Sequence, residues 1–167
     1  MYFVTTLSYD QLATLIKDKR VCIDNADMVL GQFSSAVNRY LTERMGSAGY
    51  AIGIRGQITP ASVNLLAKMD QGLNGNRVVL EAEIDESQTL SFDVAGLAEA
   101  AEILAYGLPD EDLFEQLDSS ITPSGSSPGI EVICIPAIEK IGSIRITSLN
   151  REIDVKAAGI SFVKLGQ

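Results

Sequence analysis

Apolar residues recur at the spacing of an α-helix in five separate segments of the chain. In the first of these, Ser8 and Gln11 form a capping-box pattern, and Leu12 and Leu15 then repeat at helical spacing. Caps, prolines and glycines bound the other four segments in the same way. The pattern therefore predicts helices over about 8–19, 26–45, 60–73, 95–106 and 109–118.

Other segments alternate between apolar and polar residues or are apolar throughout, which is typical of β-strands. Residues 1–7 and 50–54 predict two strands, and 21–23 predict either a brief strand or a packed connection. The run 130–135 is apolar on nearly both faces, so we expect it to be a central strand. Three further short strands are predicted by the pairs Ile144/Ile146, Ile153/Val155 and Ile160/Phe162.

The most explicit expectation concerns residues 80–94, where two alternating segments follow one another closely. They predict a β-hairpin of two strands, each apolar on one side and polar on the other. The shortest register that keeps both apolar sets on the same face leaves 86–88 as the loop and places Ile84 opposite Leu90. A loop of this length usually contains a glycine, and this one has none.

These elements together predict an α+β fold, with about five helices, mostly before residue 120, packed on a mainly antiparallel sheet. The length of 167 residues fits one domain with a sizeable core. Residues 119–129 are rich in Ser, Gly and Pro, and predict a flexible loop within a single domain over 1–167. The alternative is a pair of subdomains joined at this segment.

The composition is that of a globular protein, with 46% apolar and 21% charged residues. No apolar run approaches the ~18 residues that a membrane helix needs. The N-terminal residues lack the basic flank and apolar stretch of a secretory signal. Cys22 and Cys134 are too few for a disulfide scaffold, so we expect a soluble, cytoplasmic protein. A single bridge between them is the alternative.

The chain contains no histidine, which removes histidine bases, histidine-assisted nucleophiles and nearly all zinc or iron sites. The glycine-containing segments do not complete a P-loop or a dinucleotide fingerprint, and no EF-hand spacing is present. We therefore predict no cofactor and no metal, and the sequence disfavours an enzyme. Catalysis by carboxylates, lysine, tyrosine or backbone amides stays open.

Charge is strongly segregated along the chain, whose net charge is −9. Residues 78–139, called the acidic segment below, hold fourteen acids and no Lys or Arg. Residues 1–77 have a net charge of +2 and residues 140–167 one of +3. Either the basic ends fold back over the acidic segment, or part of this segment meets a basic partner. An acidic surface of this kind disfavours nucleic acid as a ligand.

Two sets of acids in this segment are candidate binding residues. The first lies on one face of a predicted strand, where Asp93 would stand opposite Glu81 and where a carboxylate pair, a hard-cation site or a solvated surface can form. The second lies on a predicted helix, where capping and solubility compete with docking of a basic protein. The strand set is Glu81, Glu83 and Asp85, and the helix set is Asp110, Glu111, Asp112 and Glu115.

The first functional hypothesis is a non-catalytic binding protein, of the inhibitor, immunity or adaptor type, that engages a basic protein partner through the acidic segment. Two alternatives remain: a structural or assembly subunit that acts as a homo-oligomer, and a small histidine-independent enzyme that uses carboxylates.

Overall fold

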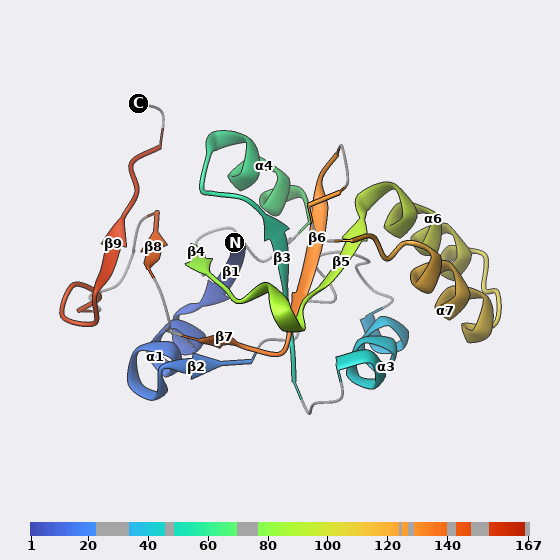
Figure 1. The fold of residues 1–167 in the computed structure, drawn as a ribbon, viewed down its shortest axis with the longest axis horizontal. Helices are drawn as coiled ribbons and strands as arrows, with labels where there is room; N and C mark the ends of the chain where they lie inside the picture. The colour runs from blue at the N-terminus through green and yellow to red at the C-terminus, as the bar shows by residue number, and fades with distance from the viewer. Residues whose placement is uncertain are drawn as a thin grey trace.

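A computed structural model shows the fold of the chain (Figure 1). It describes residues 1–22, 34–45, 49–69, 77–123, 125–126, 129–139, 143–147 and 154–165. Within these ranges there are five α-helices, a seven-stranded sheet that is antiparallel except at one edge, and a small two-stranded sheet. The predicted α+β class is thus confirmed.

The elements have the following bounds. The helices are α1 (Tyr9–Asp18), α3 (Ser34–Met45), α4 (Pro60–Met69), α6 (Val94–Ala105) and α7 (Asp110–Ser119), with a short 3-10 helix, η2 (Glu86–Gln88). The large sheet runs in the order β5 (Leu90–Asp93), β6 (Glu131–Ile135), β3 (Ala51–Arg55), β1 (Tyr2–Ser8), β4 (Arg77–Glu83), β8 (Ile144–Ile146) and β9 (Ile160–Phe162). The small sheet pairs β2 (Arg20–Val21) with β7 (Ile138–Glu139).

Local signals set several of these boundaries. The capping box at α1 is present, with the Gln11 N–H donating to Ser8 Oγ at 3.1 Å and the Ser8 N–H donating to Gln11 Oε1 at 2.8 Å. The Asp93 carboxylate caps α6 by accepting from the Ala95 N–H at 3.3 Å. Pro109 was expected to be the first residue of a helix over 109–118. It is instead the N-cap residue of α7, one position before the helix begins. The first part of the predicted helix over 26–45 lies largely outside the described residues.

The predicted hairpin over 80–94 is wrong. Strand β4 lies between β1 and β8, whereas β5 pairs with β6 at the edge of the sheet, and three strands separate β5 from β4. Both alternating segments do form strands, but Leu80 and Phe92 are buried in different cores, and alternation alone does not choose a strand's partner. Strand β1 offers β4 a register of seven paired residues, and the glycine-free 86–88 segment forms η2 instead of a tight turn.

The sheet separates two apolar cores. Helices α3, α4, α6 and α7 cover the face on which Val4 and Ile52 are buried, and this is called the helical face below. Helix α1 covers the opposite face, on which Phe3 and Leu7 are buried. The predicted central strand is confirmed, since β6 is buried along its whole length and pairs on both sides.

The C-terminal part contains two of the three predicted short strands, β8 and β9. The third is wrong at Val155, which lies in a turn, and Ile153 lies outside the described residues. None of the described helices is long and apolar enough to cross a membrane.

Candidate interaction surface

Glu81, predicted on the polar face of a strand, is fully buried on the helical face of the sheet. The Arg145 guanidinium holds its carboxylate with two contacts, from Nε at 2.5 Å and Nη2 at 2.8 Å. The Ile58 backbone N–H donates to it at 2.9 Å. This contact with Glu81 raises the pKa of Arg145. The expectation of a solvated strand face is therefore wrong at Glu81. The positive charge beside this carboxylate is Arg145 and not a bound cation.

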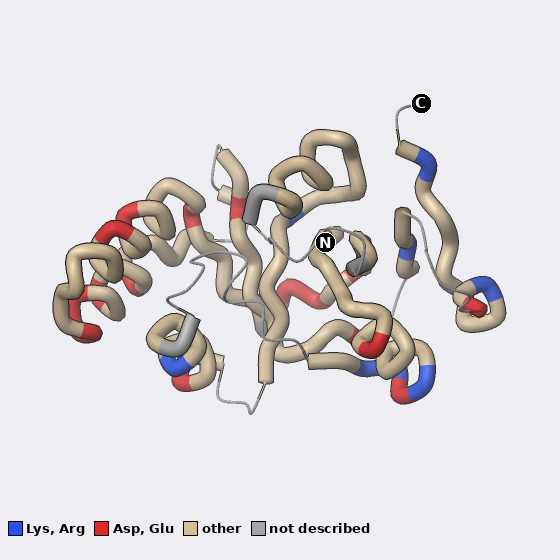
Figure 2. Tube along the Cα trace, turned by 180° about the vertical axis from the view of Figure 1, so that it is seen from behind, with Lys and Arg blue, Asp and Glu red and all other residues tan. Residues whose placement is uncertain are grey.

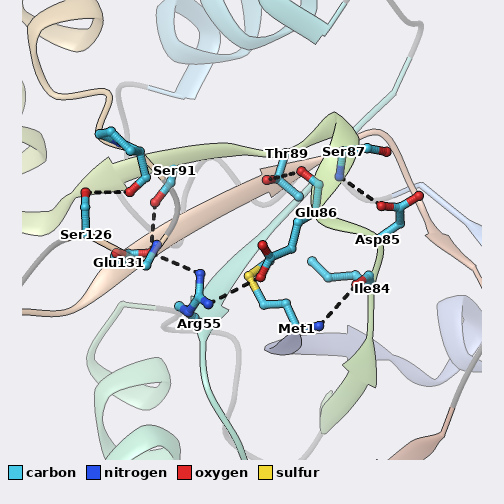
Figure 3. Close-up of polar contacts among 12 residues, drawn as sticks. Met1, Arg55, Ile84, Asp85, Glu86, Ser87, Thr89, Ser91, Ser126 and Glu131 are labelled. Carbon is cyan, nitrogen blue, oxygen red and sulfur yellow. Dashed lines mark hydrogen bonds and ion pairs between the residues drawn. The ribbon is translucent and has the colours of Figure 1, made fainter.

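The other two strand acids have separate local roles. Glu83 is half-buried and accepts a hydrogen bond from the Ser143 hydroxyl at 2.8 Å. Asp85 is exposed and caps η2 by accepting from the Ser87 N–H at 2.9 Å (Figure 3), and the hydrogen bonds with Ser87 lower its pKa. Asp93 lies opposite Glu131 rather than Glu81. The predicted carboxylate pair is thus not formed.

A second buried carboxylate, Glu131, was not among the predicted site residues. It lies at the start of β6, is 3% exposed, and accepts from Ser91 Oγ at 3.0 Å and from the Gly125 N–H at 3.1 Å. Arg55 Nη1 lies 3.7 Å from it, and Arg55 Nη2 donates to Glu86 at 3.3 Å (Figure 3). The signal in the sequence was a single charge inside the apolar run 130–135.

The α3 side of α7 is held by ion pairs. Arg39 pairs with Asp110, and its guanidinium lies 5.6 Å from the centre of the Phe114 ring. Arg44 binds both oxygens of Asp118, and Nη2 lies 2.6 Å from Oδ2. Hydrogen bonds from Arg44 and from the Tyr40 hydroxyl hold the pKa of Asp118 below its usual range. Asp110, predicted as a partner-binding residue, therefore has an internal partner.

The ion pairs found within the described residues share one rule. Each joins a base from outside the acidic segment to an acid inside it. Five arginines contact six of the fourteen acids in this way, with Arg55 shared between two of them: Glu81, Glu86, Asp110, Asp118, Glu131 and Glu139. The interpretation that the basic ends fold back over the acidic segment is correct for this part of its charge.

The outward face of the α6–α7 hairpin (residues 94–119) is different. Glu111, Asp112 and Glu115 of α7 and Glu102 of α6 are exposed and form no ion pair with any described residue. Figure 2 shows acidic positions and no basic ones along both helices. Between the two helices, Tyr106 is 80% exposed and Leu108 is 47% exposed. This face combines uncompensated negative charge with a protruding apolar tip.

One cleft, of about 440 Å³, lies next to part of the strand set. Its lining includes Glu83, Asp85 and Glu139, together with Ile135 and Pro136. Each of these carboxylates is already engaged: by Ser143, by the Ser87 N–H and by Arg20, respectively. Among the described residues, no group of three His, Cys, Asp or Glu side chains could hold a metal ion.

Both cysteines are free, so the alternative of a Cys22–Cys134 bridge is wrong. Cys134 is fully buried, and burial raises the pKa of its thiol to about 12. Cys22 is exposed and lies near Arg20 and the Pro136 carbonyl.

In comparisons with known proteins, no family model, no curated protein and no solved structure matches the chain.

Proposed function

We propose that the protein is a non-catalytic binding protein that engages a basic protein partner through the outward face of the α6–α7 hairpin. The observation that supports this is a difference within the acidic segment. The fold supplies arginines to six acids, yet it leaves Glu102, Glu111, Asp112 and Glu115 exposed without a described base.

Electrostatic attraction would give this surface its main advantage. A face of one sign attracts a partner of the opposite sign over about one Debye length, ~10 Å at moderate salt, and so accelerates association. Charge at the rim of an interface contributes little net affinity, because it stays hydrated. The exposed Tyr106 and Leu108 would supply affinity, because aromatic and apolar side chains that become buried in an interface account for much of the binding energy.

A homo-oligomer is the second candidate, and the distribution of charge supports it. The acidic α6–α7 hairpin lies at one end of the long axis and β9 lies near the other (Figure 1), and the exposed Lys156 and Lys164 flank β9 in the sequence. Such a molecule can associate head to tail. No comparable observation favours the carboxylate enzyme, because both buried glutamates are held by arginine.

The test is affinity capture from the host cell, compared between three tagged proteins. These are the wild type, the triple variant Glu111→Gln/Asp112→Asn/Glu115→Gln, and a control with the same change in net charge, Asp10→Asn/Asp18→Asn/Asp154→Asn. The control acids are exposed and lie away from the hairpin. We expect the wild type and the control to capture a basic protein. The hairpin variant should recover much less of that protein.

Stopped-flow association with the captured protein then decides the mechanism. The hairpin variant should associate several-fold more slowly at low ionic strength, and the difference should shrink as salt screens the charges. If the control slows association equally, only net charge matters and the hairpin is not the site. If capture yields only the protein itself, the homo-oligomer replaces the proposal.

A further inference from the structure

The two edges of the large sheet differ in how they are covered. At one edge, the Thr122 N–H donates to the Ser91 carbonyl at 2.9 Å, and Ile121 forms a bridge with Phe92. The segment after α7 therefore closes the edge of β5. At the other edge, β9 pairs with β8 and with no other strand that the structure describes (Figure 1).

The backbone of β9 presents hydrogen-bonding groups on its outer side. The Val163 N–H donates inward to the Ile146 carbonyl at 2.7 Å. Successive N–H groups of a strand point to opposite sides, so the Phe162 N–H points outward. Within the described part of the chain it meets no acceptor. An open edge of this kind is a template for one more strand.

The side chains around β9 indicate which strand would fit. Phe162 is 45% exposed and Leu165 is 40% exposed, which offers apolar contact to an added segment. A groove of about 480 Å³ follows the strand and is lined by Lys156 and Phe162. Lys164 is also exposed, and neither lysine has an ion pair with a described acid. The groove thus combines apolar surface with positive charge, in a protein whose net charge is −9.

We propose that the outer edge of β9 binds an acidic, extended segment of another protein, which adds to the sheet as an eighth strand. Its backbone would pair with the Phe162 N–H, its apolar side chains would contact Phe162, and its carboxylates would lie near Lys156 and Lys164. This site is distinct from the α6–α7 hairpin and takes a partner of the opposite charge, so either proposal can fail without the other.

The test uses the full-length protein and a fluorescein-labelled peptide of seven residues in which valine and glutamate alternate. Fluorescence anisotropy at low ionic strength should show saturable binding. A peptide with lysine in place of glutamate should bind at least about tenfold more weakly, because like charges would face each other. Hydrogen exchange of the Phe162 amide should slow when the acidic peptide is added.

Protein variants separate the contributions of backbone, apolar contact and charge. Phe162→Pro removes the outward N–H and should weaken binding about fivefold or more, whereas Phe162→Ala keeps that donor and should lose only the apolar contact. Lys156→Gln with Lys164→Gln should weaken binding several-fold at low salt and less at about 0.15 M salt. The matched pair Lys17→Gln with Lys19→Gln on the α1 side should leave it unchanged.

A control on the peptide makes the test independent of the folding of any protein variant. Methylating alternate backbone nitrogens of the acidic peptide, in either register, removes its donors toward the edge while the protein stays wild type. If both methylated peptides bind as tightly as the parent, or the parent shows no binding at millimolar concentration, the proposal is wrong. A dimer seen by sedimentation that Phe162→Pro dissociates would also overturn it, because a second copy would then occupy the edge.

Discussion

Two strand acids, Glu81 and Glu131, and two acids of the α7 helix, Glu111 and Glu115, carry the same charge but experience opposite environments. Glu81 and Glu131 are buried on opposite faces of the sheet, and each lies next to an arginine and accepts a hydrogen bond from one backbone N–H. Glu111 and Glu115 are exposed on α7 and have no base within the described residues. The first pair contributes to the fold, and the second leaves its charge available to the surroundings.

This difference shows why a count of acids along the chain is a poor guide to a binding surface. A buried carboxylate that loses its partner leaves another charge uncompensated, whereas an exposed carboxylate can be removed at little cost. If the contrast is correct, single substitutions should separate the two groups clearly.

Glu81→Ala should lower the free energy of unfolding by about 2–4 kcal/mol, because it leaves the partly buried Arg145 and the Ile58 N–H without their acceptor. Glu115→Ala is the matched control on the helix and should change stability by less than about 0.5 kcal/mol. Urea denaturation followed by circular dichroism measures both. Equal losses for the two variants would contradict the assignment of Glu81 to the fold.

Glu131→Ala should cost about 2 kcal/mol, since the Ser91 hydroxyl and the Gly125 N–H lose a shared acceptor. It should also accelerate proteolytic cleavage between residues 119 and 129, because Glu131 anchors this segment through Gly125. Glu86→Ala removes the other acid near Arg55 and is the control for both measurements. Cleavage at an unchanged rate in Glu131→Ala would show that the anchor does not hold the segment.

Asp118→Asn tests an acid of intermediate character, bound by Arg44 but partly exposed. The folded state lowers the pKa of Asp118, so its stabilisation is complete above the unfolded value of about 3.9 and is lost as the pH falls through the folded value. The variant should therefore be less stable than wild type at pH ~7 by at most about 1 kcal/mol, since solvent screens the pair.

The difference between Asp118→Asn and wild type should shrink as the pH drops below about 4, as followed by thermal melts across a pH series. Glu102→Gln is the control, because its carboxylate has no described basic partner, and it should show no such trend. If the stability difference between the two proteins grows as the pH falls, the ionised Asp118 carboxylate does not stabilise the fold.

Glu115→Gln should have the smallest effect, a gain of about 0.3 kcal/mol, because Glu111 and Glu115 are like charges one helical turn apart. Its companion Glu111→Gln relieves the same repulsion but loses a favourable position in the first turn of α7, so the two effects should nearly cancel. Chemical denaturation at low ionic strength measures the change in stability of both variants. A loss above about 1 kcal/mol in either variant would reveal a structural role that the exposed positions do not suggest.

Local pattern predicted most of the elements, because their causes lie within a few residues. The capping box at Ser8, the start of α4 at Pro60 and the cap at Asp93 each depend on neighbours in the chain. The exposure of three acids could also be predicted from the sequence, because helical spacing separates them from the buried Leu113 and Leu117. These acids are Glu111, Asp112 and Glu115.

Strand partners and the environment of the strand acids were decided only in three dimensions. Alternation in residues 80–85 marks two faces but does not say which face meets water, and here helices and strands cover both. Glu81 meets Arg145 because β8 pairs with β4 across 64 positions of sequence, a contact that no local rule anticipates. The sequence by itself determined the elements and the segregation of charge. Tertiary pairing decided which charges are neutralised inside and which remain at the surface, because only long-range packing brings an arginine to a particular carboxylate.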